Sequence, residues 1–346
     1  MNFDEQIGSS GILFDDAPGP ARNDKGHNGC HKILESKLKI VGQSPSIQRC
    51  LDLAQRAAET KTTVLLLGES GTGKEIFARA IHHWSDRKNR PFMAINCVGL
   101  SKELLESELF GHEKGSFTGA HQLKKGKMEL AHQGTVFLDE IGDIAPELQT
   151  RLLRFLQERE FERVGGTQRI SVDIRIIAAT NRDLAGAVKQ ERFRDDLFYR
   201  LNVLSILIPP LRQRQEDIPA LAYYFLHRFS AENKKSFTTI AQEAEKKLLA
   251  HEWSGNVREL ANVIERAVVL GQEPMINLRD LPPEIANQEI SQPSEIVSYR
   301  TAMEHCRREI LQKALTQTRG NRAAAARLLR LRRTYFFKLI KSRGID

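Results

Sequence analysis

The chain has 346 residues with a net charge of +8, long enough for two or three domains of ordinary size. No apolar run reaches the roughly 18 residues of a membrane-spanning helix, and the N-terminus lacks the basic-then-apolar order of a secretory signal. The four cysteines are scattered without metal-ligand spacing, so we expect reduced thiols, no membrane partner and a cytoplasmic bacterial protein.

A glycine-rich loop is the first motif along the chain that carries chemistry. Residues 1–39 are polar and we expect them to be flexible. Residues 63–67 predict a strand buried on both faces, and residues 75–81 predict a helix. This order of strand, loop and helix identifies a phosphate-binding loop, whose amides would hold ATP and whose lysine would neutralise its phosphates. The loop consists of Gly68, Glu69, Ser70, Gly71, Thr72, Gly73 and Lys74.

Glu75 stands where such loops usually carry the hydroxyl ligand of Mg²⁺, so the metal must depend on other groups. Residues 135–140 supply candidates, because this apolar strand ends in Asp139 and Glu140. Asp139 would hold Mg²⁺ and its waters, and Glu140 would polarise the attacking water. Acids at a strand end also cap turns, but their place after a phosphate-binding loop favours catalysis.

Two further predicted strands end in an amide side chain. Residues 92–95 precede Asn96, and residues 174–179 precede Thr180 and Asn181. The carboxyl ends of parallel strands face the nucleotide crevice of an open α/β sheet, so Asn181 is a candidate sensor of the γ-phosphate, with Asn96 at the equivalent level. Either asparagine also suits the start of a turn, and that alternative stays open.

The last 48 residues are strongly basic. Residues 299–346 contain thirteen Lys and Arg against three acids, a net charge of +10 that leaves the rest of the chain near −2. This asymmetry favours binding to a nucleic-acid phosphate backbone. Residues 302–316 predict an amphipathic helix, and residues 322–329 and 332–342 predict two shorter helices. The tail therefore predicts a helix-turn-helix.

Seven segments in this order resemble the AAA+ ATPase domain of bacterial enhancer-binding proteins, the activators of sigma-54 RNA polymerase. They are residues 68–75, 108–112, 115–120, 137–142, 163–166, 193–202 and 253–260. The family commonly carries a glutamate at the position of Glu75, and its Fis-type DNA-binding domain resembles the tail from Asn321 onward. The resemblance implies an α/β fold, an AAA+ P-loop ATPase with a helical lid, plus a small all-α helix-turn-helix domain.

The resemblance also implies roles for single residues. Asn96 resembles the switch asparagine that holds the strand-end glutamate. Arg194 and Arg200 resemble arginine fingers that are given to a neighbouring subunit, which requires a ring, by resemblance a hexamer. Arg258 resembles the sensor arginine of the lid. Local ion pairs, for example with the acids at positions 195 and 196, are the alternative for these arginines.

One loop and one helix would contact the partners of this family. The sigma-54-engaging loop would be Gly115, Ser116, Phe117, Thr118, Gly119 and Ala120, with Ser116 in place of the commoner alanine. Without the resemblance, a glycine-rich turn with Phe117 tucked into the core would be favoured. The candidates for DNA contact are Arg322, Arg330, Arg332, Arg333, Thr334, Tyr335 and Lys338. Arg330 replaces the usual turn glycine, and Phe336 is expected in the core.

We therefore expect five segments and a transcription activator. The segments are a flexible N-terminus (1–39), the ATPase core (40–209), the lid (210–285), a linker (286–298) and the DNA-binding domain (299–346). The expected partners are the sigma-54 RNA polymerase holoenzyme, upstream enhancer DNA, copies of the chain itself and a regulatory protein acting in trans. The cofactors would be ATP and Mg²⁺. Two other classes stay open, namely an AAA+ remodeller of another target and a repressor whose ATPase fold only oligomerises.

Overall fold

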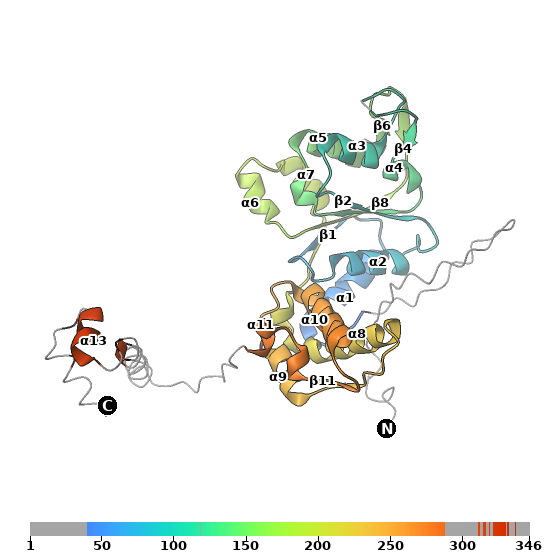
Figure 1. Cartoon of the computed structure of the whole chain (residues 1–346). Helices are drawn as coiled ribbons and strands as arrows, with labels where there is room; N and C mark the ends of the chain where they lie inside the picture. The colour runs from blue at the N-terminus through green and yellow to red at the C-terminus, as the bar shows by residue number, and fades with distance from the viewer. Residues whose placement is uncertain are drawn as a thin grey trace. The chain divides into compact units, whose positions relative to one another are not determined.

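The computed structural model describes residues 40–117, 119–287, 311, 314–315, 318, 321–329, 331 and 336 (Figure 1). These residues belong to two compact units, Met1–Gln288 and Glu289–Asp346. Several predicted contact residues lie outside the described residues, namely Thr118, Arg330, Arg332, Arg333, Thr334, Tyr335 and Lys338. Within the part of the chain that the structure describes, no helix is long and apolar enough to cross a membrane.

A five-stranded parallel sheet forms the centre of the first unit, in the order β2-β5-β8-β1-β9. The strands are β1 (Val64–Leu67), β2 (Phe92–Asn96), β5 (Thr135–Asp139), β8 (Arg175–Thr180) and β9 (Leu204–Leu207). The four strands predicted from apolar runs are confirmed to within one residue at each end. Sequence reasoning missed β9, the short edge strand, because only Ile206 of its four residues is buried.

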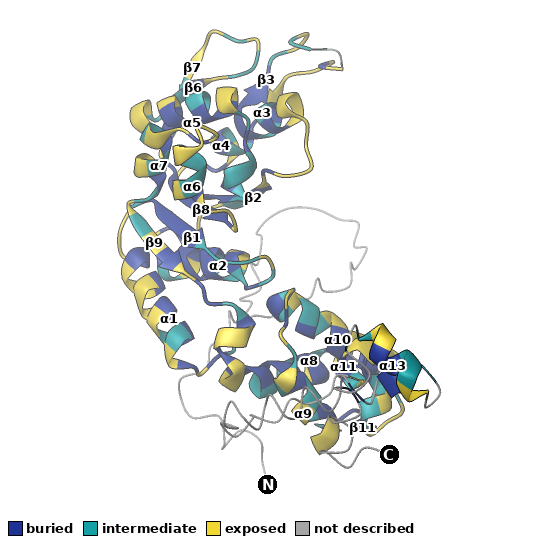
Figure 2. Cartoon of the chain, turned by 90° about the vertical axis from the view of Figure 1, so that its left-hand side faces the viewer, coloured by how far each residue is buried: buried dark blue, intermediate teal, exposed yellow. Residues whose placement is uncertain are grey.

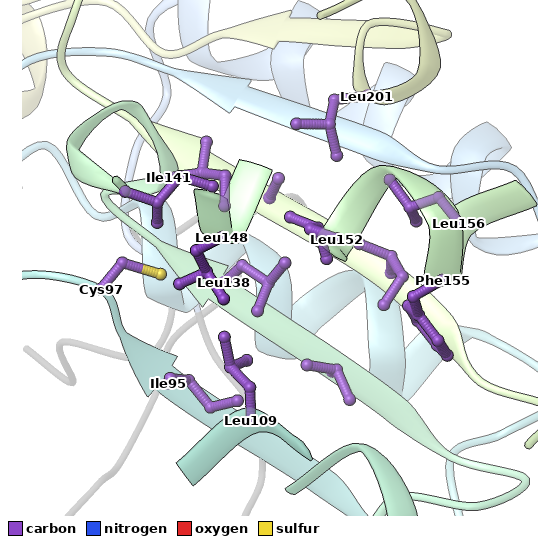
Figure 3. Close-up of a cluster of buried hydrophobic side chains, with 14 of the residues drawn as sticks. Ile95, Cys97, Leu109, Leu138, Ile141, Leu148, Leu152, Phe155, Leu156 and Leu201 are labelled. Carbon is purple, nitrogen blue, oxygen red and sulfur yellow. The ribbon is translucent and has the colours of Figure 1, made fainter. Parts of the chain in front are cut away.

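Helices cover both faces of the sheet, and neighbouring residues of a strand point to opposite faces. Leu65 packs in the cluster on one face, while Val64 and Leu66 pack in the cluster on the other. The helices are α1 (Pro45–Ala58) and α2 (Lys74–Trp84) on one side, with α3 (Lys102–Phe110), α5 (Pro146–Glu158) and α7 (Asp195–Leu201) on the other. In Figure 3, Leu138 of β5 lies among Leu148 and Leu152 of α5. This double burial explains why the strands are apolar throughout.

Two small hairpins and three short helices extend the sheet unit. The antiparallel pairs are β3 (Gly111–His112) with β4 (Lys124–Lys125), and β6 (Glu160–Glu162) with β7 (Arg169–Ser171). The helices are α4 (Lys127–Leu130), the 3-10 turn η2 (Ile141–Asp143) and α6 (Leu184–Lys189). Both hairpins lie at the end of the unit remote from α8 to α11 (Figures 1 and 2).

A helical subdomain with its own core follows β9 in the chain. It comprises η3 (Leu211–Gln213), η4 (Gln215–Asp217), α8 (Ile218–Glu232), β10 (Thr239–Ile240), α9 (Gln242–Ala250), α10 (Asn256–Leu270), β11 (Met275–Ile276), η5 (Leu278–Asp280) and α11 (Pro283–Ala286). Trp253 is fully buried, and its indole Nε1 donates to Leu248 O at 2.8 Å. Figure 2 shows the buried faces of α8 and α10 packed together.

The second unit contains α13 (Arg322–Leu328), which matches the helix predicted over residues 322–329 to within one residue. Asn321 caps this helix, because its side chain accepts from Ala324 N at 3.2 Å. Ala325 and Phe336 are fully buried in a small cluster with Leu311, which confirms the prediction that Phe336 belongs to the core.

Candidate active site

A cleft of about 260 Å³ opens where the phosphate-binding loop, the end of β5 and helices α8 and α10 meet. It is lined by Ser70, Gly71, Gly73, Lys74, Glu75, Ile76, Asp139, Glu140, Phe225, Val257, Arg258 and Ala261. The structure therefore brings together the loop, the two strand-end acids and the candidate lid arginine, which are far apart in the chain.

The loop leads directly into the N-terminus of α2. Its last glycine, Gly73, is the N-cap and has no side chain to satisfy the first helix amides, which leaves them available to an anion. Lys74 is buried, and its Nζ donates to Gly68 O at 2.9 Å and to Glu69 O at 3.3 Å. A phosphate between these amides and this ammonium group would be neutralised from two sides.

Asp139 and Glu140 lie beside Lys74. Glu140 Oε1 is 3.4 Å from Lys74 Nζ, and Glu140 Oε2 accepts from Asn181 N at 3.0 Å. Burial raises the pKa of Asp139, the charge of Glu140 adds to this shift, and Lys74 opposes it. Glu140 has a φ of 53°, in the left-handed region that costs energy for a residue other than glycine. Such strain is often found where a side chain must be aimed at a reacting group.

The oxygen donors of the cleft suit Mg²⁺. This ion is usually held by one or two carboxylates together with phosphate oxygens and water, and Asp139 and Glu140 offer that set. Glu75 is engaged elsewhere, because Oε1 accepts from Arg79 Nε at 3.1 Å and Nη2 at 2.8 Å. Thr72 Oγ1 likewise donates to Glu69 O at 2.8 Å.

The two asparagines at strand ends differ in their surroundings. Asn96 pairs in register with Asp139 on the neighbouring strand, but its Oδ1 accepts from Val98 N at 2.8 Å. The turn predicted as the alternative for Asn96 is therefore formed. At Asn181, the backbone amide binds Glu140.

A second pocket, of about 190 Å³, adjoins the loop between residues 40–41, α2 and α8. Its lining is mostly apolar and aromatic: Ile40, Val41, Thr72, Gly73, Ile76, Phe77, Arg214, Leu221, Tyr224, Phe225, Arg228 and Val257. Sequence reasoning missed this pocket, because its walls come from segments separated by more than a hundred residues.

Sequence reasoning also missed residues that join the lid to the loop. Arg212 Nη1 donates to Glu69 Oε2 at 2.7 Å, and the bonds from Arg212 and Asn256 lower the pKa of Glu69 to about 2. Arg214, which is buried, donates to Thr72 O at 3.1 Å. The predicted sensor Arg258 is exposed, and its Nη1 donates to Ser70 Oγ at 3.0 Å.

Arg194 and Arg200 are exposed at α7 and line neither pocket. Arg194 pairs with Asp196 through Nε at 3.0 Å and Nη2 at 2.7 Å, which is the local pairing considered as the alternative. Arg200 Nη2 donates to Leu156 O at 3.3 Å. Within one chain these two arginines therefore do not line the cleft that contains Asp139 and Glu140.

The segment from Gly115 to Ala120 forms a tight turn after β3. Gly115 N donates to Ala120 O at 2.8 Å, and Ala120 N donates to Phe117 O at 3.0 Å. Gly115 and Gly119 have φ values of 84° and 105° and face open space, so their backbone conformation, rather than crowding, requires glycine. The Phe117 ring is half-buried, with its centroid 4.9 Å from that of His112. Phe117 is thus neither deep in the core nor fully exposed.

Of the predicted DNA contacts, the structure describes Arg322. It is exposed on the first turn of α13 and so is free to face a phosphate backbone.

Comparison with known families gives three matches in the same order. Residues 40–207 match the Sigma-54 interaction domain, residues 212–296 the AAA+ ATPase lid domain, and residues 303–335 the bacterial regulatory protein, Fis family. The regulatory protein AtoC of Escherichia coli is 50 % identical over 327 residues, covering 91 % of this chain and 70 % of that protein. The Nif-specific regulatory protein of Herbaspirillum seropedicae is 53 % identical over 246 residues, which are 70 % of this chain and 45 % of that protein.

A solved structure agrees with these matches. NtrX from Brucella abortus, crystallised in complex with ATP, has 36 % identity and a TM-score of 0.69, covering 89 % of this chain and 70 % of that one. The parallel sheet, the phosphate-binding loop and the lid described above are those of an AAA+ P-loop ATPase. The chain therefore belongs to the family of sigma-54-dependent transcriptional activators, with an AAA+ ATPase domain, its lid and a Fis-type DNA-binding domain.

Proposed function

We propose that this protein binds upstream DNA, assembles into a ring and uses ATP hydrolysis to convert the closed sigma-54 RNA polymerase complex into the open one. The observation that carries the proposal is the convergence of Lys74, Asp139, Glu140 and Arg258 on one cleft. The turn at 115–120 lies on the hairpin end of the same unit, away from the lid (Figure 1). One rigid sheet thus separates a hydrolytic site from a candidate contact loop.

In the proposed site, the triphosphate of ATP lies on the loop and the adenine enters the pocket beside Tyr224 and Phe225. A mostly apolar pocket with a few polar groups suits a planar base. Asp139 would hold Mg²⁺, which neutralises charge on the phosphate oxygens. Glu140, fixed by the amide of Asn181, would orient the attacking water, and Arg258 would reach the phosphates from the lid.

The exposed arginines of α7 support assembly. Arg194 and Arg200 do not reach the cleft of their own chain, so we propose that they complete the site of a neighbouring copy in a ring, a hexamer by family resemblance. An arginine supplied in this way stabilises charge in the transition state and raises the rate by roughly 10³–10⁵-fold. Arg194 would exchange Asp196 for the γ-phosphate of the neighbour.

The remaining contacts follow from the loop and the tail. We propose that Phe117 and Thr118 engage sigma-54, since Phe117 is only half-buried and the flanking Gly115 and Gly119 face open space. The basic tail would bind upstream DNA and raise the local concentration of the ATPase near the promoter. Because its DNA and polymerase are in the bacterial cytoplasm, we place the protein there.

The decisive experiment is promoter opening by purified sigma-54 RNA polymerase with this protein and either ATP or a non-hydrolysable analogue. We expect opening with ATP alone, detected as permanganate-reactive thymines near the start site. ATP turnover without opening would be consistent with an ATPase but would refute the sigma-54 RNA polymerase complex as its target. Opening with the analogue would refute the requirement for hydrolysis.

A further inference from the structure

The side chain of Asn256, the first residue of α10, is fully buried and links separate segments. Its Nδ2 donates to Ser70 O at 3.0 Å, to Glu69 Oε2 at 3.2 Å and to Ser254 O at 3.4 Å. Its Oδ1 accepts from Leu211 N at 2.8 Å. A single amide thus joins the phosphate-binding loop to the start of the lid and to α10.

The backbone around Asn256 is held in an unfavourable conformation. Trp253 and Asn256 have φ values of 54° and 55°, and Asn256 N donates to Trp253 O at 2.8 Å. Positive φ is tolerable for asparagine but is costly for a bulky residue such as tryptophan. The burial of Trp253 compensates this cost, and the turn directs the Asn256 amide at the loop.

Other contacts bring the same two segments together. Gly71 lies so close to the lid that an added Cβ would be 2.2 Å from Gly255 O. Arg212 holds the carboxylate of Glu69 from the lid side, at 2.7 Å. The lid therefore contacts the loop at Ser70 and Gly71, which line the cleft, and at Glu69 directly before them.

We propose that Asn256 is a positioning residue for nucleotide binding, which acts through Glu69 and Ser70 of the loop. Its Nδ2 draws the Ser70 carbonyl and the Glu69 carboxylate toward the lid. Both groups are acceptors, and either would repel phosphate oxygens if it turned into the cleft. The inference rests on the proposed nucleotide site but is independent of the sigma-54 target.

The substitution Asn256→Asp removes the donor and places a carboxylate opposite Glu69. The new side chain keeps an oxygen to accept from Leu211 N, so the bond within the lid survives, while a carboxylate replaces the donor to the loop. We expect the dissociation constants of fluorescent Mg-ATP and Mg-ADP analogues to rise roughly 10–100-fold. The turnover rate at saturation should change less, since Asn256 touches no reacting atom. Asn287→Asp, an identical change at the exposed C-cap of α11, should leave affinity unaltered.

A second variant guards against a merely structural effect. The side chain of Glu69 is substantially exposed, so Glu69→Gln should fold normally and weaken binding by roughly 3–10-fold. In the double variant Asn256→Asp with Glu69→Gln, the new amide at position 69 can donate to the new carboxylate at position 256, which is the native bond with donor and acceptor exchanged. We expect it to bind nucleotide more tightly than Asn256→Asp alone, a recovery that damage to the lid would not produce.

Three outcomes would overturn the inference. Unchanged affinity in Asn256→Asp would show that the donor does not shape the loop. Absence of any recovery in the double variant would show that Asn256 does not act through Glu69. Failure of the native chain to bind either nucleotide would remove the nucleotide site itself, and this inference with it.

Discussion

Removing the carboxylate of Asp217 should destabilise the protein more than most single changes. Asp217 is fully buried, and it accepts from Gln43 N at 2.7 Å, Ser44 N at 2.8 Å and Ser44 Oγ at 2.8 Å. Burial lowers the pKa of the Arg214 guanidinium, and the negative charge of Asp217 opposes this shift. Asp217→Ala leaves three donors without their acceptor and removes the negative charge near the buried Arg214 guanidinium, a loss of about 3–5 kcal/mol.

The variant Asp217→Asn separates hydrogen bonding from charge. Its Oδ1 can still accept from both backbone amides, and the Ser44 hydroxyl can turn to accept from the new amide. We expect a loss of only about 1–2 kcal/mol. Asp183→Ala is a suitable control, because Asp183 caps α6 at an exposed site through one bond of 3.0 Å to Gly186 N, worth about 1 kcal/mol.

Equilibrium urea unfolding followed by tryptophan fluorescence measures these losses, since Trp253 reports on the lid and Trp84 on the sheet unit. The bonds of Asp217 also fix residues 43 and 44, next to Ile40 and Val41 in the wall of the second pocket. The KM for ATP should therefore rise in Asp217→Ala. A loss below about 1 kcal/mol, or an Asn variant as damaged as the Ala variant, would refute the reasoning.

Four further outcomes are expected. Thr118→Ala should keep ATP hydrolysis and lose promoter opening, and retained opening would remove the loop from its proposed role. Glu140→Ala should bind ATP with a turnover lower by about 10²-fold or more, measured as phosphate release; normal turnover would exclude Glu140 as the group that orients water. Arg332→Ala should weaken DNA binding and flatten its salt dependence in a titration, and an unchanged slope would argue against a phosphate contact. Burial lowers the pKa of His82 to about 4, below its value of about 6.5 in the unfolded chain. The contribution of neutral His82 to the free energy of unfolding should therefore be complete above about pH 6.5 and be lost toward pH 4, and His82→Asn should remove this part of the pH dependence in urea unfolding.

The sequence predicted the parts of the site whose residues are neighbours in the chain, and it did not predict contacts between residues that are far apart in the chain. The phosphate-binding loop and the acids at the end of β5 can each be recognised from a few consecutive residues, because a single turn or a single strand end positions them. They lie together in a single cleft because the strands of the parallel sheet all end at one edge.

The lid contacts had no comparable signal. Asn256 and Arg214 meet the loop across more than 140 residues of chain. Asn256 lies in the family-like segment 253–260, but the pattern of that segment assigned a role to Arg258 and none to Asn256. The left-handed conformation of Glu140 was equally hidden, since a glutamate after a strand normally predicts an ordinary turn. Such features depend on tertiary packing, which a pattern of residue types does not specify.

The partners of Glu140 suggest how the cleft responds to phosphate. Lys74 is shared between two loop carbonyls and Glu140, while Asn96 is occupied with Val98 N. A γ-phosphate offers Lys74 a stronger partner than a carbonyl oxygen, because it carries full charge. If Lys74 turned to it, Glu140 would lose this ammonium group and, of the partners in the described part of the chain, would keep the amide of Asn181, which leaves room for another donor. Asn96 lies in register beside Asp139, and we propose that its amide supplies this donor, so Asn96→Ala should uncouple ATP binding from promoter opening more than it lowers affinity.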